Sequence, residues 1–140
     1  EGILQALNKY KRLVKKLATP IQLPKTNQYQ QSFLTQIKDK TIIKYTIDIA
    51  FFIIDFETVY FYTFSGEKFP IYKNLEYIES VSNPKDFFRI NRQVLLNKKA
   101  VISIEPYFNR KIIVNTPIKI SEKLIVSRLK VSEFKKWLEQ

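Results

Sequence analysis

The spacing of apolar residues changes along the chain from a helical period to a strand period. Between residues 3 and 17, apolar side chains recur every three or four positions, at Ile3, Leu7, Tyr10, Val14 and Leu17. This spacing predicts an amphipathic helix whose opposite face is basic. From residue 32 onward, apolar and polar residues alternate with a period of two, which is typical of β-strands.

Prolines separate these two regions. Pro20 and Pro24 end the helical pattern, and the polar residues around them predict a linker over 18–31. The chain contains no Met, so we expect a fragment of a longer protein. Residues 1–31 would then connect an upstream domain to a folded domain over 32–140. Alternatively, the helix makes a dimer contact or folds back on this same domain.

Short strands are predicted wherever β-branched and aromatic residues alternate with polar ones between turn residues. They cover residues 32–38, 41–47, 49–54, 58–64, 68–71, 87–97, 100–105, 111–115 and 124–126. Asp39-Lys40 and Ser65-Gly66-Glu67 are predicted as hairpin turns, and Asn109 as a residue with positive φ. Residues 119–122 are predicted as a polar loop.

Two short helices are predicted within this β-rich region. Asn74 would cap the first, 75–81, and Glu76 lies in its first turn, where the helix dipole favours a carboxylate. Ser127 would cap the second, 129–139. Its apolar stripe consists of Val131, Phe134, Trp137 and Leu138. We therefore predict a mostly antiparallel β domain with two short helices.

The stretch 87–97 carries the most suggestive chemistry. On an extended chain Phe88 and Ile90 point to one face, whereas Arg89 and Asn91 point to the other. Guanidinium and amide groups are the ones that read guanine and adenine edges in the major groove. A plain surface strand also carries such residues, and the pattern alone leaves that alternative open.

Composition removes most catalytic chemistry. The 140 residues are 45% hydrophobic and 14% aromatic, enough for a core, with no Cys and no His. Carboxylates are scattered, and no glycine-rich phosphate loop is present. We expect no enzyme activity, no cofactor, no metal site and no disulfide. No apolar run approaches the roughly 18 residues of a membrane span, and nothing resembles a signal peptide.

The charge points to a polyanion as partner. Lys and Arg number 24 against 13 Asp and Glu, giving a net charge of +11. This excess is typical of proteins that bind the nucleic-acid backbone, although solubility or an anionic membrane surface would also account for it. Aromatic residues could stack on single-stranded bases, but their strand and turn positions favour a place in the core.

Motifs in a fixed order carry a resemblance to a known family. They are Ile49-Ala50-Phe51-Phe52, Lys68-Phe69-Pro70-Ile71, Asn74-Leu75-Glu76, Phe87-Phe88-Arg89-Ile90-Asn91-Arg92-Gln93, Asn97, Glu105-Pro106-Tyr107-Phe108-Asn109, Ile125-Val126-Ser127-Arg128 and Phe134-Lys135-Lys136-Trp137-Leu138. In order and spacing the chain resembles, over about 32–139, the LytTR DNA-binding domains of bacterial two-component response regulators (the LytR/AlgR family). Residues 1–17 likewise resemble the last helix of a receiver domain.

The resemblance implies an elongated, mainly β fold of about ten short antiparallel strands with an N-terminal linker helix. Such a fold reads the major groove of double-stranded DNA from loops and strand ends. Arg92 and Arg128 match base-contacting positions, and Ser127 with the start of the final helix would contact a phosphate through backbone N–H groups. Lys130 is also among the residues that we expect to contact DNA.

Other matching positions leave alternatives open. Asn91 would contact a base or a phosphate, and Arg89 would contact a phosphate or form a structural ion pair. Asn97 is expected to satisfy backbone groups at a strand end. A third family contact lies in the loop 55–59, where this sequence has no polar or basic group suited to it.

We therefore expect a sequence-specific DNA-binding output domain of a bacterial, cytoplasmic transcriptional response regulator. The family implies binding to paired half-sites by two copies, hence a homodimer on DNA, with control from an upstream receiver domain. The rivals are a basic module for RNA or an anionic membrane surface, and a signalling adaptor that binds a protein partner.

Overall fold

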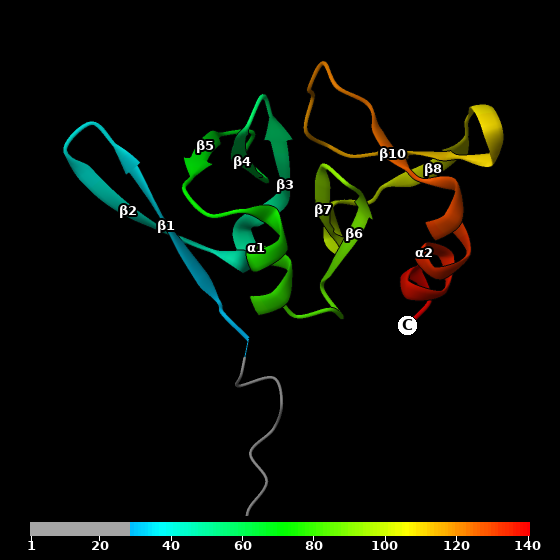
Figure 1. Cartoon of the computed structure of the whole chain (residues 1–140), viewed down its shortest axis with the longest axis horizontal. Helices are drawn as coiled ribbons and strands as arrows, with labels where there is room; N and C mark the ends of the chain where they lie inside the picture. Colours follow the sequence, from blue (N-terminus) through cyan, green and yellow to red (C-terminus); the bar gives the residue numbers. More distant parts are fainter. Residues whose placement is uncertain (1–28) are drawn as a thin grey trace, which may run out of the picture.

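The computed structural model describes residues 29–140, which contain ten strands in three antiparallel sheets and two α-helices (Figure 1). The elongated, mainly β fold predicted from the sequence is confirmed. The helix predicted over 3–17 and most of the linker over 18–31 lie outside the described residues.

The first sheet is a hairpin of β1 (Ser32–Ile37) and β2 (Lys40–Tyr45), which projects from one end of the domain (Figure 1). Its turn is Lys38-Asp39, one residue earlier than predicted, because Lys38 itself adopts the positive φ of 55°. Phe33 and Thr35 anchor β1, with the Thr35 hydroxyl donating to the carbonyl of Pro70.

The second sheet forms the centre of the domain. Its five strands are β3 (Ile49–Asp55), β4 (Thr58–Thr63), β5 (Lys68–Ile71), β6 (Phe87–Asn91) and β7 (Val94–Asn97), in the order β5-β4-β3-β7-β6. The first five residues of β3 are all buried, so both faces of the sheet are covered. Phe52 belongs to the core beneath α1 (Leu75–Val81), and Phe51 to the core on the opposite face.

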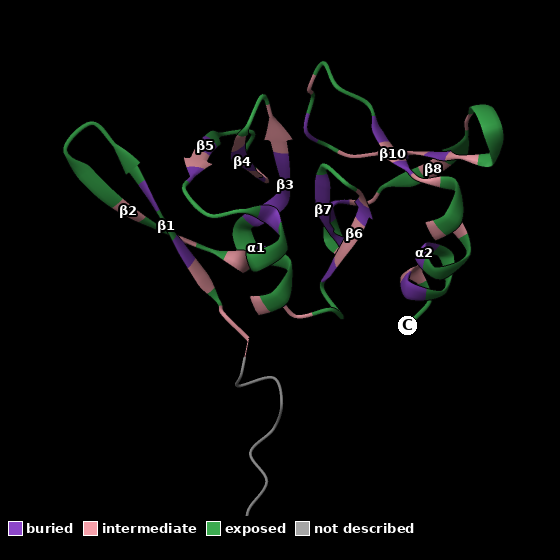
Figure 2. Cartoon of the chain, in the orientation of Figure 1, coloured by how far each residue is buried: buried purple, intermediate pink, exposed green. Residues whose placement is uncertain are grey.

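The third sheet and the last helix cover that opposite face. The sheet has the order β10-β9-β8, formed by β8 (Ser103–Pro106), β9 (Ile112–Asn115) and β10 (Leu124–Val126). Helix α2 (Val131–Leu138) packs Phe134 and Trp137 against Phe88, and the Trp137 indole N–H donates to the carbonyl of Pro84 at 2.8 Å. The buried residues are therefore concentrated in the inner strands, whereas the tip of the β1–β2 hairpin is exposed (Figure 2).

Several local predictions are confirmed. The Asn74 side chain accepts from the N–H of Tyr77 at 2.7 Å and starts α1 where expected. Asn109 has φ 58°, and Arg110 follows it with φ 64°. The buried Asn97 donates to the carbonyl of Ile49 at 2.9 Å and accepts from a backbone N–H, so it satisfies backbone groups.

Three local predictions are wrong. Residues 87–97 form a hairpin rather than one extended stretch, with its turn at Arg92-Gln93. The strand predicted from residue 100 begins at Ser103, because the Asn97 side chain caps a 3₁₀ turn over 98–100. The Ser127 side chain forms no cap bond, and α2 begins only after a 3₁₀ turn over Arg128–Lys130.

Candidate nucleic-acid interface

The turn between β6 and β7 is closed by the side chain of Arg89. Its Nε donates to the carbonyl of Asn91 at 2.9 Å, and an Nη donates to the carbonyl of Arg92. Nη1 pairs with Glu79 on α1 at 2.9 Å, and the Nη2 that bonds the Arg92 carbonyl also pairs with Glu76 at 3.4 Å. The Arg89 side chain is only 10% exposed. It therefore fixes the backbone of the turn and ties the turn to α1, as the ion-pair alternative requires.

The Asn91 side chain is also bound to backbone groups. Its Oδ1 accepts from the N–H of Gln93 at 2.7 Å, in the way Asn commonly shapes a turn. Its Nδ2 donates to the carbonyl of Ile125 in β10 at 2.6 Å. Bidentate reading of adenine would need both groups directed at one base, whereas here they point to two separate backbone partners.

A seam of hydrogen bonds joins β6 to the segment that begins with β10. Besides the Asn91 bond, the N–H of Ser127 donates to the carbonyl of Ile90 at 3.0 Å. The ammonium of Lys130 donates to the carbonyl of Arg89, also at 3.0 Å, and lies over the ring of Phe88. These bonds hold the β6–β7 turn and the Arg128–Lys130 turn in a fixed relation across two different sheets.

An open hollow of about 980 Å³ lies at this seam and brings most of the predicted site residues together. It is lined by Ile54, Glu76, Glu79, Arg89, Asn91, Arg92, Gln93, Ser127 and Lys130. Arg128, the remaining predicted residue, follows Ser127 in the chain and lies outside the lining.

Two guanidinium groups differ from the rest of this set. Arg92 and Arg128 are both exposed, and neither side chain has a hydrogen bond or ion pair within residues 29–140. Each extends from a turn whose backbone is fixed by the seam. Both can therefore contact an external partner without much rearrangement of the domain.

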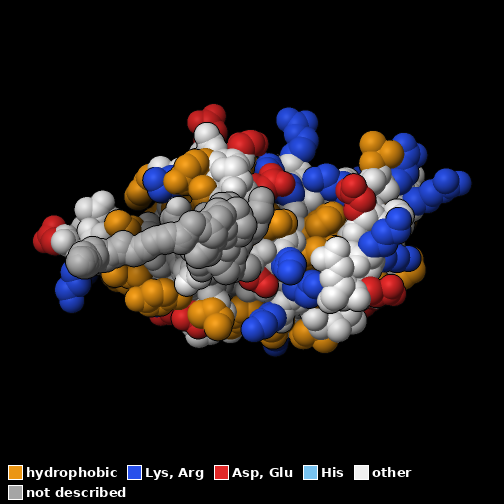
Figure 3. Space-filling model, turned by 90° about the horizontal axis from the view of Figure 1, so that it is seen from below, with side chains coloured by type: hydrophobic (Ala, Val, Ile, Leu, Met, Phe, Trp, Pro, Cys, Tyr) orange, Lys and Arg blue, Asp and Glu red, His pale blue; other side chains and the backbone are white. Residues whose placement is uncertain are grey.

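The charges around the hollow are unevenly distributed. A backbone N–H at the start of α1, and then the Arg89 guanidinium, hold the pKa of the Glu76 carboxyl below its ordinary value. The ionised Glu76 carboxylate therefore lies beside Arg89, on the side of the hollow that α1 forms. Seen from below, Lys and Arg side chains gather on the half of the molecule that carries the third sheet and α2 (Figure 3).

Neither a membrane span nor a metal cluster is evident in the described part of the chain. No helix within residues 29–140 combines the length and apolarity that crossing a bilayer requires. The same residues contain no group of three or more Asp, Glu, His or Cys side chains arranged to hold a metal ion.

Comparison with known protein families decides the family of this chain. The family model described as the LytTr DNA-binding domain matches residues 39–139. The chain belongs to the LytTR family of DNA-binding domains. The family assignment expected from the sequence is therefore confirmed, and the basic surface with two unengaged arginines belongs to a DNA-binding domain.

The fold of this LytTR domain agrees with a solved structure. That structure is the LytTr DNA-binding domain of a protein described as a methyl-accepting/DNA response regulator from Bacillus cereus. The two are 16% identical with a TM-score of 0.68, and the match covers 79% of this chain and 99% of the other. A search of curated proteins finds no match.

Sequence reasoning missed Gln93, and it named the loop 55–59 as a family contact without foreseeing its backbone conformation. Gln93 shares the hollow, and its carbonyl accepts from the N–H of Ile54 at 2.9 Å, which places the end of β3 beside the β6–β7 turn. Beyond that end lies the β3–β4 turn, Phe56-Glu57, in which both residues have positive φ. The short gap between the strands predicted over 49–54 and 58–64 was the available signal, because tight hairpin turns favour positive φ.

Proposed function

We propose that this LytTR domain binds double-stranded DNA in a sequence-specific manner as the output domain of a bacterial transcriptional response regulator in the cytoplasm. The observation that carries the proposal is the exposure of Arg92 and Arg128 on backbone segments joined by the β6–β10 seam. Two free guanidinium groups on backbone segments in a fixed relation suit bidentate contacts to guanine O6 and N7.

The other site residues take two supporting roles. The Ser127 N–H, from which the sequence predicted a phosphate contact, is bound to the carbonyl of Ile90. The Ser127 hydroxyl and the Lys130 ammonium contact phosphates instead, which sets the register of the domain on the duplex. Arg89 and Asn91 act as positioning residues, because their polar atoms are bound to the turn and to β10. This assignment favours the ion-pair alternative for Arg89 over a phosphate contact.

The wider context of the domain follows from the family. Residues 1–31 connect the DNA-binding domain, 32–140, to an upstream receiver domain, and two copies occupy paired half-sites as a homodimer. Support comes from the resemblance of residues 1–17 to a receiver helix and from the description of the Bacillus cereus protein as a response regulator.

The proposal is tested by selecting bound duplexes from a random DNA pool at near-physiological salt. We expect one short motif, repeated at a fixed spacing. Arg92→Ala and Arg128→Ala should each weaken binding to that motif by about 1–3 kcal/mol, the worth of a bidentate base contact. Lys136→Ala on the exposed face of α2 removes the same charge and should leave the preference unchanged.

Affinities of each variant for the selected duplex and for a scrambled duplex separate the outcomes. Equal loss on both duplexes would reassign that arginine to a phosphate contact. Salt-sensitive binding to any duplex, without an enriched motif, would overturn sequence specificity. A preference for single-stranded RNA or anionic vesicles would favour another basic binding module, and binding indifferent to both salt and nucleic acid would favour a protein partner.

A further inference from the structure

The first described residues fasten the start of the domain to α1. The N–H of Gln30 donates to the carbonyl of Val81 at 2.8 Å, and Val81 is the last residue of α1. Carbonyls in the last turn of a helix have no partner within the helix, so this bond satisfies one of them. The carbonyl of Gln31 accepts from the N–H of Thr46 at 2.9 Å. Residues 29–31, which we call the strap, are therefore held between α1 and the turn that follows β2.

Helix α1 also holds the β6–β7 turn. Glu76 and Glu79 on α1 pair with the Arg89 guanidinium, which donates to the carbonyls of Asn91 and Arg92. The helix spans only seven residues, too few to be stable in isolation, so its place is set by what it contacts. Figure 1 shows it between β1 and β6. A shift of α1 would therefore displace the guanidinium that shapes the turn.

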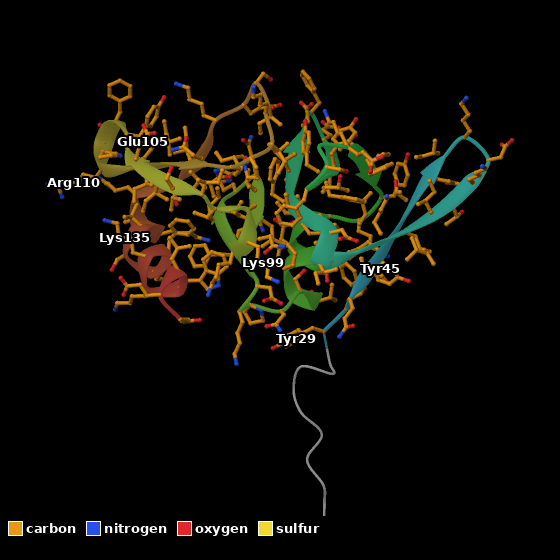
Figure 4. All side chains as sticks on the ribbon, turned by 180° about the vertical axis from the view of Figure 1, so that it is seen from behind. Tyr29, Tyr45, Lys99, Glu105, Arg110 and Lys135 are labelled. Carbon is orange, nitrogen blue, oxygen red and sulfur yellow. The ribbon has the colours of Figure 1, made fainter. Side chains whose placement is uncertain are left out.

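Open space borders the strap. A second hollow, of about 380 Å³, is lined in part by Tyr29, Tyr45, Phe87 and Lys99. Figure 4 shows Tyr29, Tyr45 and Lys99 around the place where the described chain begins. A segment beside open space has fewer packing contacts to resist displacement than a segment in a close-packed core. The position of the strap therefore depends strongly on its main-chain hydrogen bonds.

We propose that Gln30 is a positioning residue for DNA recognition. Its main-chain bond sets the place of α1, and α1 sets the conformation of the Arg92 turn through Arg89. The proposal rests on the proposed function, and it adds a route by which the chain before residue 29 controls affinity. Displacing the strap loosens the Arg89 ion pairs, and the β6–β7 turn then samples more conformations. Contacts that need a fixed Arg92 are weakened most.

Two substitutions at Gln30 test this route. Gln30→Pro removes the N–H, whereas Gln30→Ala keeps it and is the matched control. Both remove the side-chain bond to the carbonyl of Ser32. Amide hydrogen exchange at Gln93, whose N–H is bound to the Asn91 side chain, reports on the turn without DNA. We expect exchange there to be about fivefold faster in Gln30→Pro, the equivalent of one lost hydrogen bond, and unchanged in Gln30→Ala.

Affinity for DNA gives the second readout. Gln30→Pro should bind the selected duplex about fivefold more weakly than the unmodified protein, with little loss on the scrambled duplex. Arg89→Met cuts the route between α1 and the turn. In that background Gln30→Pro should change neither the affinity nor the exchange at Gln93 any further. Leu75 and Ile78 still bury one face of α1, so we expect every variant to fold, which urea unfolding verifies.

The outcomes separate this proposal from the proposed function. Unchanged exchange at Gln93 in Gln30→Pro would overturn the role of Gln30, even if unfolding showed a loss of stability. Additive effects of Gln30→Pro and Arg89→Met would overturn the route through Arg89. Faster exchange at Gln93, with no duplex selected from the random pool, would contradict the proposed function while upholding the link between the strap and the turn.

Discussion

At the scale of single residues, Arg89 is bound by carbonyls of the turn that follows it. Replacing it with Met keeps the aliphatic stem and removes the guanidinium. We expect Arg89→Met to lower the free energy of unfolding by about 1–3 kcal/mol, because the carbonyls of Asn91 and Arg92 lose their donors. Urea unfolding monitored by Trp137 fluorescence measures this change.

The acidic partners of Arg89 serve as the control for that variant. Glu76 and Glu79 are 75% and 46% exposed, and exposed ion pairs contribute little to stability because water and salt screen them. Glu79→Gln should therefore destabilise the domain less than Arg89→Met does. Equal effects would show that the ion pair, and not closure of the turn, is what Arg89 contributes.

Glu76 gives the domain a predictable response to acid. Its folded-state pKa lies below the unfolded value, so its contribution to stability is present above the unfolded pKa and lost as pH falls through the folded pKa. The ordinary value is 4.5, so the loss should begin near that pH and continue below it. Glu76→Gln should flatten this part of the stability curve in urea unfolding across acidic pH. An unchanged slope would contradict it.

At the scale of secondary-structure elements, the β3–β4 hairpin contains strain that its sequence could relieve. Replacing Phe56-Glu57 with Asn-Gly should raise the free energy of unfolding by about 1–2 kcal/mol, because both residues accept a left-handed backbone more readily. Thermal and urea unfolding both test this. The turn between β4 and β5 has no such strain, because its residue with a positive φ of 92° is Gly66. No gain in stability would show that the turn is relaxed as it stands.

Elements whose signals are local could be predicted from the sequence, and those that depend on distant partners could not. Asn74 begins α1 through a bond three residues along the chain, and the residue pattern contains that information. Ser127 offers the same type of side chain, yet its N–H is bound to Ile90 in another sheet, and α2 starts later. The turn at Arg92-Gln93 contains neither Gly nor Pro and is shaped instead by the preceding Asn91.

The candidate site shows the same division. Alternation in 87–97 indicated that Arg89 and Asn91 leave the core face together, but not that both would be bound by backbone groups. The prediction that Arg92 and Arg128 contact bases came from the resemblance to LytTR domains, and the structure adds that both side chains are exposed. The positive φ of Phe56 in the loop 55–59 could not be predicted, because an aromatic residue in a turn has no pattern that indicates it.

At the scale of the whole molecule, the net charge of +11 should make DNA binding strongly dependent on salt. Lys130→Ala removes one phosphate contact under the proposed function. We expect its logarithmic salt slope to be smaller by about 0.9, with affinity reduced for every duplex. The loss should be somewhat larger for the selected duplex, because the bond to the Arg89 carbonyl that helps to fix the Arg128 turn is lost as well. Titrations at several salt concentrations, on selected and scrambled duplexes, measure both effects.

Lys135→Ala provides the matched control for this salt effect. Lys135 lies on the exposed side of α2 (Figure 4), and its loss removes the same charge. Its slope should stay close to that of the unmodified domain. If both lysines changed the slope equally, binding would depend on the overall field of the protein and not on a contact made by Lys130.

The seam between β6 and β10 has a consequence for how such domains diverge. Its acceptors are the main-chain carbonyls of Arg89, Ile90 and Ile125, together with those of Asn91 and Arg92 in the turn. Main-chain carbonyls are the same whichever side chain is attached. Arg92 and Arg128 can therefore be exchanged while the frame persists. After gene duplication, a descendant could acquire a new operator through a few codon changes, without first evolving a new scaffold.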